Sequence, residues 1–251
     1  MKQFRNPEFA KAYYQRGINF FEKGDLDQAI DNFLKAVRLD PEFIDLLINL
    51  GKAFLQKSDA KKAIDYFSKA IKIEPERWEI FLLRAEAYAR IGDFTHEIAD
   101  YTAAIRLKPD DPGIYGKRAT VFMQTKRYED AIKDYTKLLK MRPTLIWIKV
   151  IRGDAYFEIG RFKDAIDDYN VFIRLHPEYP EVYLRRGRAL SSLGNFELAI
   201  NDFTKTIELA PELVDAYILR AQSLKKIGRL KEAERDIQIA SRISQSIKNN
   251  P

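Results

Sequence analysis

Apolar side chains recur along this chain at spacings of three and four residues, in short runs separated by polar turns. Within a unit of 34 residues they fall at positions 4, 8 and 11, and again at 17, 20, 21, 24, 27 and 28. Apolar residues at i, i+3, i+4 and i+7 share one face of a helix, so each unit predicts two amphipathic helices. Position 15, between the two runs, is Gly in five units and Ser58 or Lys126 in the other two, which predicts a turn there.

Seven prolines set the period of this pattern, each 34 residues from the next: Pro7, Pro41, Pro75, Pro109, Pro143, Pro177 and Pro211. With the proline at position 32, the predicted repeats are residues 10–43, 44–77, 78–111, 112–145, 146–179, 180–213 and 214–247, after a lead-in over 1–9 and before a tail over 248–251. A helix pair of this size buries its apolar face only against neighbouring pairs. We therefore expect one domain of stacked repeats rather than two globular domains.

Two further columns keep the same register. Position 8 is always small, being Gly17, Gly51, Ala85, Ala119, Gly153, Gly187 and Ala221, while position 24 is aromatic in all repeats except the last. A small residue opposite a ring lets the two helices of a pair approach closely. The fixed period and these columns resemble the tetratricopeptide repeat (TPR) family over residues 10–247. The resemblance implies an all-α fold, a right-handed superhelix (α-solenoid) of seven helix-turn-helix repeats, in which the first helix of each pair lines a concave groove.

Arginine and aspartate also vary together. Position 7 is Arg and position 23 is Asp in repeats 3 to 7, whereas repeat 2 has Leu50 and Tyr66 in their places and repeat 1 pairs Arg16 with Asn32. This covariation predicts a partly buried contact between the two helices of a repeat. The alternative is a ladder of arginines that bind a ligand.

Composition and charge narrow the function. The 251 residues carry 43 Lys and Arg against 37 Asp and Glu, include no Cys, and have two His that lie far apart. No HExxH, P-loop or dinucleotide-binding motif is present, so we expect no enzyme activity, cofactor or metal site. No apolar stretch approaches the roughly 20 residues of a membrane span, and no secretory signal follows the first basic residues, which favours a cytoplasmic protein.

The groove lining indicates the ligand class. Apolar residues recur at the lining positions of the first helices, and an apolar stripe on a solvated wall is typical of a binding site. We predict a groove that binds a peptide or helix of a protein partner, mainly by apolar contacts, through these residues: Asn49, Lys52, Leu83, Lys117, Met123, Trp147, Val150, Ile151, Asp154, Phe157, Arg185 and Arg188. The alternative is that the apolar members pack between neighbouring helices as core of the wall.

A pocket is expected where repeat 4 meets repeat 5. Gly113 and Gly116 leave the wall of repeat 4 thin, and Trp147 and Phe157 follow in repeat 5. This gap predicts a hydrophobic pocket for one or two apolar side chains of the partner, unless the glycines merely let the tryptophan fold back into the gap. Lys149 stands where a large apolar residue is usual and puts regular packing of repeat 5 in doubt.

Charge separates the remaining alternatives. The groove positions carry eight basic and eight acidic residues, so the excess positive charge lies elsewhere, chiefly in repeats 4 and 7. A nucleic-acid groove needs a basic lining, and this one is balanced. Nucleic-acid or acidic-partner binding through the outer surfaces of repeats 4 and 7, and self-association through the groove, stay as alternatives. The lysines and asparagines of the family's carboxylate clamp for chaperone tails match at no more than one position in any frame, so no such clamp is predicted.

Overall fold

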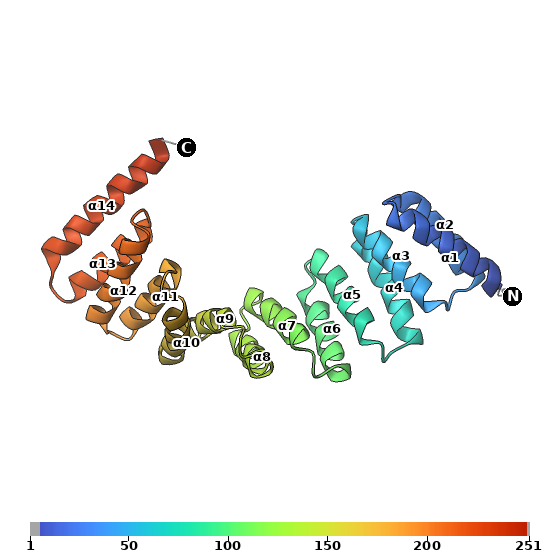
Figure 1. Ribbon diagram of the computed structural model, residues 1–251, viewed down its shortest axis with the longest axis horizontal. Coiled ribbons are helices and arrows are strands. Elements are labelled where there is room, and N and C mark those ends of the chain that lie inside the picture. Colours follow the sequence, from blue (N-terminus) through green and yellow to red (C-terminus); the bar gives the residue numbers. More distant parts are fainter. Residues whose placement is uncertain (1–5, 250–251) are drawn as a thin grey trace. The chain divides into compact units, whose positions relative to one another are not determined.

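The chain is described by a computed structural model over residues 6–249, with side chains through residue 246. Within that range it forms fourteen α-helices joined by short turns and contains no strand (Figure 1). The helices are α1 (Pro7–Glu22), α2 (Leu26–Leu39), α3 (Ile44–Gln56), α4 (Ala60–Ile73), α5 (Trp78–Arg90), α6 (Phe94–Leu107), α7 (Pro112–Gln124), α8 (Tyr128–Met141), α9 (Trp147–Glu158), α10 (Phe162–Leu175), α11 (Pro180–Ser192), α12 (Phe196–Leu209), α13 (Val214–Lys226) and α14 (Leu230–Asn249). None of the described helices combines the length and the apolarity needed to span a membrane.

The helices form seven helix-turn-helix repeats, which confirms the all-α prediction. Each odd-numbered helix is the first of a pair (helix A), and each even-numbered helix is the second (helix B). The chain divides into two compact units, Met1–Val121 and Phe122–Pro251, and the boundary between them falls inside α7. In the first unit α3 contacts α1 and α5, and in the second unit α11 contacts α9 and α13. Successive A helices therefore lie side by side within each unit, as a groove wall requires.

The turn inside each repeat has one backbone conformation throughout. All seven residues at position 15 have positive φ, including Ser58 at 64° and Lys126 at 57° among glycines near 70° to 80°. Glycine adopts this left-handed region without steric penalty, whereas a Cβ atom makes it unfavourable. An aspartate follows the turn in the first three repeats, and its carboxylate caps the next helix, as when Asp59 accepts from the Lys62 amide at 3.2 Å.

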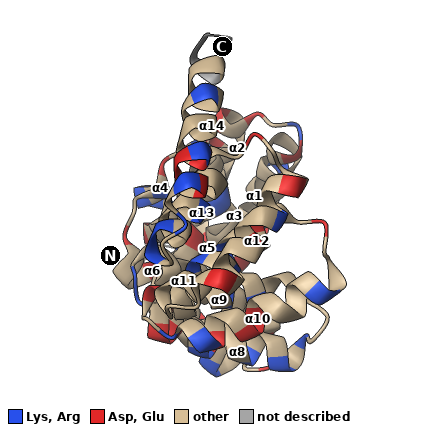
Figure 2. Ribbon diagram, turned by 90° about the vertical axis from the view of Figure 1, so that its left-hand side faces the viewer, with Lys and Arg blue, Asp and Glu red and all other residues tan. Residues whose placement is uncertain are grey.

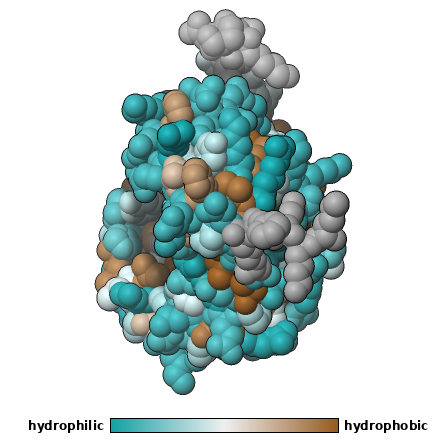
Figure 3. All heavy atoms as spheres, turned by 90° about the vertical axis from the view of Figure 1, so that its right-hand side faces the viewer, coloured by the Kyte–Doolittle hydropathy of each residue, from teal (hydrophilic) through white to brown (hydrophobic). Residues whose placement is uncertain are grey.

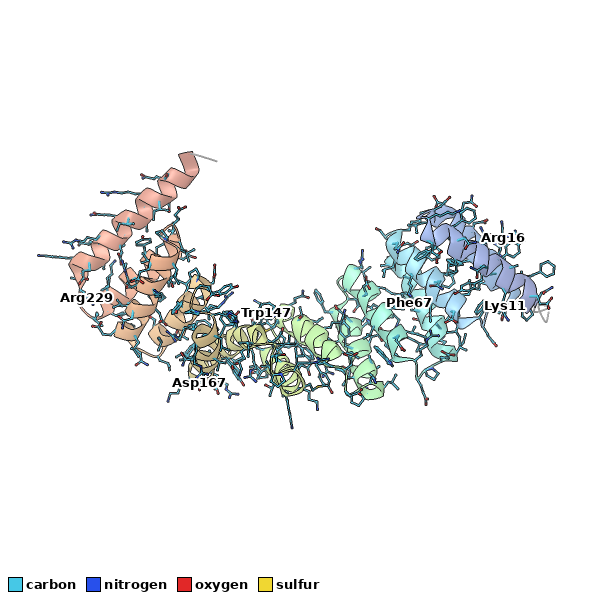
Figure 4. The ribbon with its side chains drawn as sticks, viewed as in Figure 1. Lys11, Arg16, Phe67, Trp147, Asp167 and Arg229 are labelled. Atoms are coloured by element: carbon cyan, nitrogen blue, oxygen red, sulfur yellow. The ribbon has the colours of Figure 1, made fainter. Side chains whose placement is uncertain are left out.

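The small residue at position 8 marks the closest approach of the two helices. A Cβ atom on Gly51 would lie 2.5 Å from the ring of Phe67, and one on Gly187 would lie 2.6 Å from the ring of Phe203. Both rings are fully buried, and Figure 4 marks Phe67 within the α3–α4 region. The aromatic ring thus fills the space that the missing side chain leaves, as the two columns predict.

The predicted contact between Arg and Asp is confirmed in repeats 3, 5, 6 and 7. In repeat 5, Arg152 donates from Nε to Asp168 Oδ2 and from Nη2 to Oδ1, both at 2.8 Å. The same two-point geometry joins Arg84 to Asp100 and Arg220 to Asp236. These aspartates are 3 to 4% exposed, so each arginine neutralises a buried carboxylate.

A third partner links each of these arginines to the preceding repeat. Arg152 Nη1 donates to Thr136 Oγ1 at 2.9 Å, and Arg84 Nη1 donates to Ser68 Oγ at the same distance. Because Nε, Nη1 and Nη2 are all engaged, the contacts favour a structural role over a ladder of ligand-binding arginines. Lys149 joins this network as well, since its Nζ lies 3.5 Å from Asp168 Oδ1. A lysine at this apolar position is therefore paired rather than disruptive.

In repeat 2 the pair is replaced by an apolar contact. Leu50 is fully buried, and Tyr66 stacks on Phe54 with ring centroids 5.6 Å apart and planes 4° from parallel. Because repeat 2 lacks both members of the pair, neither position carries a buried charge.

Candidate partner-binding site

Two adjoining pockets lie in the second unit, both of them on α9, α10 and α11, and the first extends to the end of α7 and the start of α8. The first has a volume of about 510 Å³ and is lined by Met123, Lys126, Tyr128, Asp154, Phe157, Glu158, Tyr169, Arg185 and Arg188. The second has a volume of about 470 Å³ and is lined by Trp147, Val150, Ile151, Asp154, Phe172, His176, Tyr179, Glu181, Val182 and Arg185. Asp154 and Arg185 belong to both linings, so the pockets share one wall.

Eight of the twelve predicted groove residues come together here. They are Met123, Trp147, Val150, Ile151, Asp154, Phe157, Arg185 and Arg188. Three other hollows, of about 300 to 470 Å³, contain none of the twelve. The predicted lining of repeats 5 and 6 is therefore a contiguous surface.

The other four predicted residues belong to the first unit. Asn49 Nδ2 donates to the Tyr14 hydroxyl at 2.8 Å, which ties α3 to α1. Leu83 is half-buried against the core, Lys52 is half-buried, and Lys117 is exposed. Asn49 and Leu83 thus both make contacts within the first unit.

Part of the apolar lining proves to be wall core. Ile48 is 6% exposed and Leu55 is 5% exposed in repeat 2, because helices on both sides cover α3. In repeat 5, Val150 is likewise 5% exposed and packs in the same buried cluster as Phe172 and Val182. Most of the surface of these three side chains is therefore packed between helices, as the alternative interpretation expects.

The pocket expected where repeat 4 meets repeat 5 is found in part. The first pocket joins Met123, Lys126 and Tyr128 of repeat 4 to residues of repeats 5 and 6, whereas the second pocket lies between repeats 5 and 6. Gly113 and Gly116 belong to the first unit and line neither pocket. Trp147 keeps 58% of its surface exposed, so it does not fold back into the protein. Figure 4 marks this residue on α9.

The wall between the pockets is a hydrogen-bonded ion pair. Arg185 Nε lies 3.2 Å from Asp154 Oδ1, and the Tyr169 hydroxyl donates to the same oxygen at 2.7 Å. Burial raises the pKa of Asp154, while Arg185 and the Tyr169 hydroxyl oppose that rise. Burial and the neighbouring carboxylate together raise the pKa of Tyr169. The phenol therefore stays protonated and keeps donating to Asp154.

The first pocket combines cations with apolar side chains. The Arg188 guanidinium lies 5.1 Å from the centroid of the Phe157 ring, which in turn meets Phe162 edge to face at 5.3 Å. A guanidinium above a ring is held by the negative face of the π-system. Lys126 from the turn before α8 adds a second positive charge, and Glu158 adds a negative one.

Three aromatic rings form one side of the second pocket. The centroid of Phe172 lies 4.9 Å from that of His176 and 5.6 Å from that of Tyr179, and the last two rings meet edge to face at 5.9 Å. These residues were not predicted from the sequence, because the groove was predicted from helix A alone. Phe172 lies in the last turn of α10, whereas His176 caps the C-terminus of that helix and Tyr179 immediately precedes α11. The turn between repeats 5 and 6 therefore brings the three rings together.

The chain belongs to the tetratricopeptide repeat family. Profiles of this family, described as TPR repeat or tetratricopeptide repeat, match residues 19–58 and 153–194, residues 48–112, and residues 112–145 and 180–213. The family predicted from the 34-residue period is thereby confirmed.

Solved structures share this fold at low sequence identity. One of them, MamA, is 24% identical, with a TM-score of 0.62 over 66% of this chain and 96% of that one. A tetratricopeptide repeat protein from Parabacteroides merdae is 20% identical, with a TM-score of 0.61 over 94% of this chain and 93% of that one. YrrB, described as a TPR protein with an unusual peptide-binding site, is 14% identical, with a TM-score of 0.63 over 77% of this chain and 97% of that one. No curated protein sequence matches the chain.

Proposed function

We propose that this chain is a protein-interaction scaffold without catalytic activity, and that its second unit holds a segment of a partner polypeptide against α9, α10 and α11. The observation that carries this proposal is the exposed Trp147, which lines the second of the two adjoining pockets. The proposed repeats are those delimited by the 34-residue period, from 10–43 to 214–247.

The chemistry of the two pockets supports a polypeptide ligand. Binding sites for peptides combine apolar surface that gains from leaving water with a few polar groups that fix orientation. Here Trp147 and Ile151 supply apolar surface, while Asp154 and Arg185 supply the polar groups. Burial of an exposed tryptophan is worth about 2 kcal/mol or more from its area alone, enough to anchor a short segment.

The surface charges give less support to the alternative function, the binding of nucleic acid or of an acidic partner. Lys and Arg alternate with Asp and Glu along the helices seen in Figure 2. On the face drawn in Figure 3 most atoms are hydrophilic, and hydrophobic atoms gather in small patches. Two solved relatives add support by analogy: YrrB is described as having a peptide-binding site, and Naa15/Naa10 was solved bound to HypK.

Selection from a random peptide library tests the proposal. The purified protein and its Trp147→Ala variant are each used to select binders from a library of displayed 12-residue peptides. Leu230→Ala is the matched control, because Leu230 is also exposed, at 57%, but lies on α14. We expect peptides that bind the wild type and Leu230→Ala but lose binding to Trp147→Ala. Enriched peptides that bind Trp147→Ala equally well would contradict a site at these pockets. Steep loss of binding with added salt and selection of acidic peptides would instead favour the basic surfaces.

A further inference from the structure

We propose that the second pocket, lined by Trp147, His176, Tyr179 and Glu181 among others, accepts the cationic side chain of an arginine or lysine in the partner segment. This inference rests on the proposed function and specifies the chemistry of the ligand. It adds a charged contact to the mainly apolar binding that the sequence predicts.

The charges of the lining are not balanced. Asp154 and Arg185 neutralise each other at 3.2 Å, which leaves Glu181 as the remaining charged residue of the lining. Glu181 is exposed and forms no ion pair with any residue over the range that the structure describes. A second carboxylate lies close by, since Glu178 Oε1 is 3.6 Å from His176 Nδ1 of the lining. A positive group in this pocket would thus complete the charge balance.

The rings provide a second, independent attraction for a cation. Trp147 is 58% exposed and Tyr179 is 47% exposed, so both present ring surface to a ligand. Tryptophan has the strongest cation–π interaction of the aromatic side chains, and such contacts contribute about 0.5 to 2 kcal/mol. The neighbouring pocket already shows this geometry within the chain, where Arg188 stands over Phe157.

The apolar lining fits the stem of the same side chain. Val150, Ile151 and Val182 line the pocket together with these rings. Arginine and lysine place their methylene stems on apolar surface while the charged head stays near polar groups or water. A leucine or phenylalanine would use the stem surface but leave Glu181 without a partner.

Glu181 also has a structural role, and the test must distinguish this role from binding of a cation. It lies in the first turn of α11, where a negative charge stabilises the helix N-terminus, and Asp215 has the same place in α13. The acidic residue alone therefore says little about a ligand, and the surrounding rings distinguish the pocket. Asp215→Asn removes a helix charge of the same kind without touching this lining, which makes it the matched control for Glu181→Gln.

Affinities of one selected peptide and its neutral analogue test the proposal. A peptide that depends on Trp147 is synthesised with its basic residue as arginine and as citrulline, which keeps the shape but removes the charge. Fluorescence anisotropy gives the Kd of each peptide for the wild type, Glu181→Gln and Asp215→Asn. We expect citrulline to weaken binding at least tenfold on the wild type and on Asp215→Asn, and less than threefold on Glu181→Gln.

Each other outcome has one consequence. If the Trp147-dependent peptides share no basic residue, or if citrulline binds the wild type within threefold of arginine, the pocket takes an apolar side chain and the cation proposal fails while the proposed function stands. An equal loss with citrulline on Glu181→Gln and on the wild type would place the cation elsewhere and also overturn the proposal. If no selected peptide depends on Trp147, the proposed function and this inference both fail.

Discussion

Arg186 of α11 and Asp202 of α12 form a two-point ion pair inside their hairpin, with Nε to Oδ2 at 2.8 Å and Nη2 to Oδ1 at 2.6 Å. The same guanidinium donates from Nη1 to Asn170 Oδ1 of α10 at 2.6 Å. One side chain thus holds the two helices of its own repeat together and joins them to the repeat before. The side chain of Asp202 is 7% exposed, so its charge depends on this partner.

Removal of the arginine alone should destabilise the protein more than removal of both partners. Arg186→Leu leaves the Asp202 carboxylate buried without its cation, and we expect a loss of about 3 kcal/mol in the free energy of unfolding. Arg186→Leu combined with Asp202→Tyr reproduces the Leu50 and Tyr66 arrangement of repeat 2 and should recover much of that loss. Urea unfolding of the four proteins of this cycle measures the coupling, and simple additivity of the two changes would contradict the pairing.

The hydrogen bond that links each arginine to the preceding repeat can be removed without removing the ion pair. Thr204 Oγ1 donates to the Ile200 carbonyl at 2.7 Å and accepts from Arg220 Nη1 at 3.0 Å. Thr204→Val should reduce stability by about 1 kcal/mol, the usual contribution of one hydrogen bond. Thr120→Val is the control, because Thr120 Oγ1 bonds the Gly116 carbonyl of its own helix in the same way but is exposed. Equal unfolding midpoints for the two variants would speak against the link.

The left-handed turn residues predict a stabilising substitution. Ser58 has φ of 64°, where a Cβ atom is unfavourable, so Ser58→Gly should stabilise the chain by about 1 kcal/mol. The reverse change, Gly92→Ser at φ of 71°, should destabilise it by a similar amount. Thermal unfolding of both variants checks the pair, and a fall in Tm for Ser58→Gly would show that the hydroxyl, not the backbone, determines this turn.

Glu97 is a buried acid at a position that is alanine in the other six repeats. It is 4% exposed, and its Oε2 atom has no hydrogen-bond partner among the described residues. An unsatisfied buried polar group costs about 1 to 3 kcal/mol, so Glu97→Ala should stabilise the protein by about 2 kcal/mol at neutral pH. Denaturant unfolding at pH 7 measures the difference.

The same substitution should change the pH dependence of stability. Burial raises the pKa of Glu97, so the folded state binds its proton more tightly than the unfolded state does. This group therefore favours folding at low pH, and that contribution is lost as pH rises through the raised pKa. The stabilisation by Glu97→Ala should be smaller at pH 4 than at pH 7. The exposed Glu234→Ala serves as the control, and a gain for Glu97→Ala that does not vary with pH would contradict the raised pKa.

The period of the sequence predicts the architecture because each repeat uses the same few contacts. Small residues such as Gly187 and rings such as Phe203 meet where their columns indicate, and Arg186 meets Asp202. The third partner was not predicted, although its column is polar throughout repeats 2 to 6. A short polar side chain on a helix is equally typical of a solvated face, and only the packing of neighbouring repeats places it within reach of a guanidinium.

The sequence predicted the residues of the site that come from helix A, but not those that come from helix B and the turns. Trp147 and Phe157 line the two pockets, whereas Asn49 bonds with Tyr14 inside the first unit. His176 and Tyr179 reach the pocket from the turn between repeats, so the columns of helix A contain no signal for them. Lateral packing of A helices also decides which apolar residues are covered, as it does for Ile48, and a single repeat cannot show this.

The fluorescence of Trp147 provides the most direct test of a partner site on α9, α10 and α11. The chain has two tryptophans, so Trp78→Phe leaves Trp147 as the only reporter, and Trp147→Phe leaves Trp78 in the first unit as the matched control. Titration with a library-selected peptide should shift the emission of the Trp78→Phe protein in a saturable way and leave that of the Trp147→Phe protein unchanged. A peptide that binds by anisotropy without altering the emission of Trp147 would contradict the account.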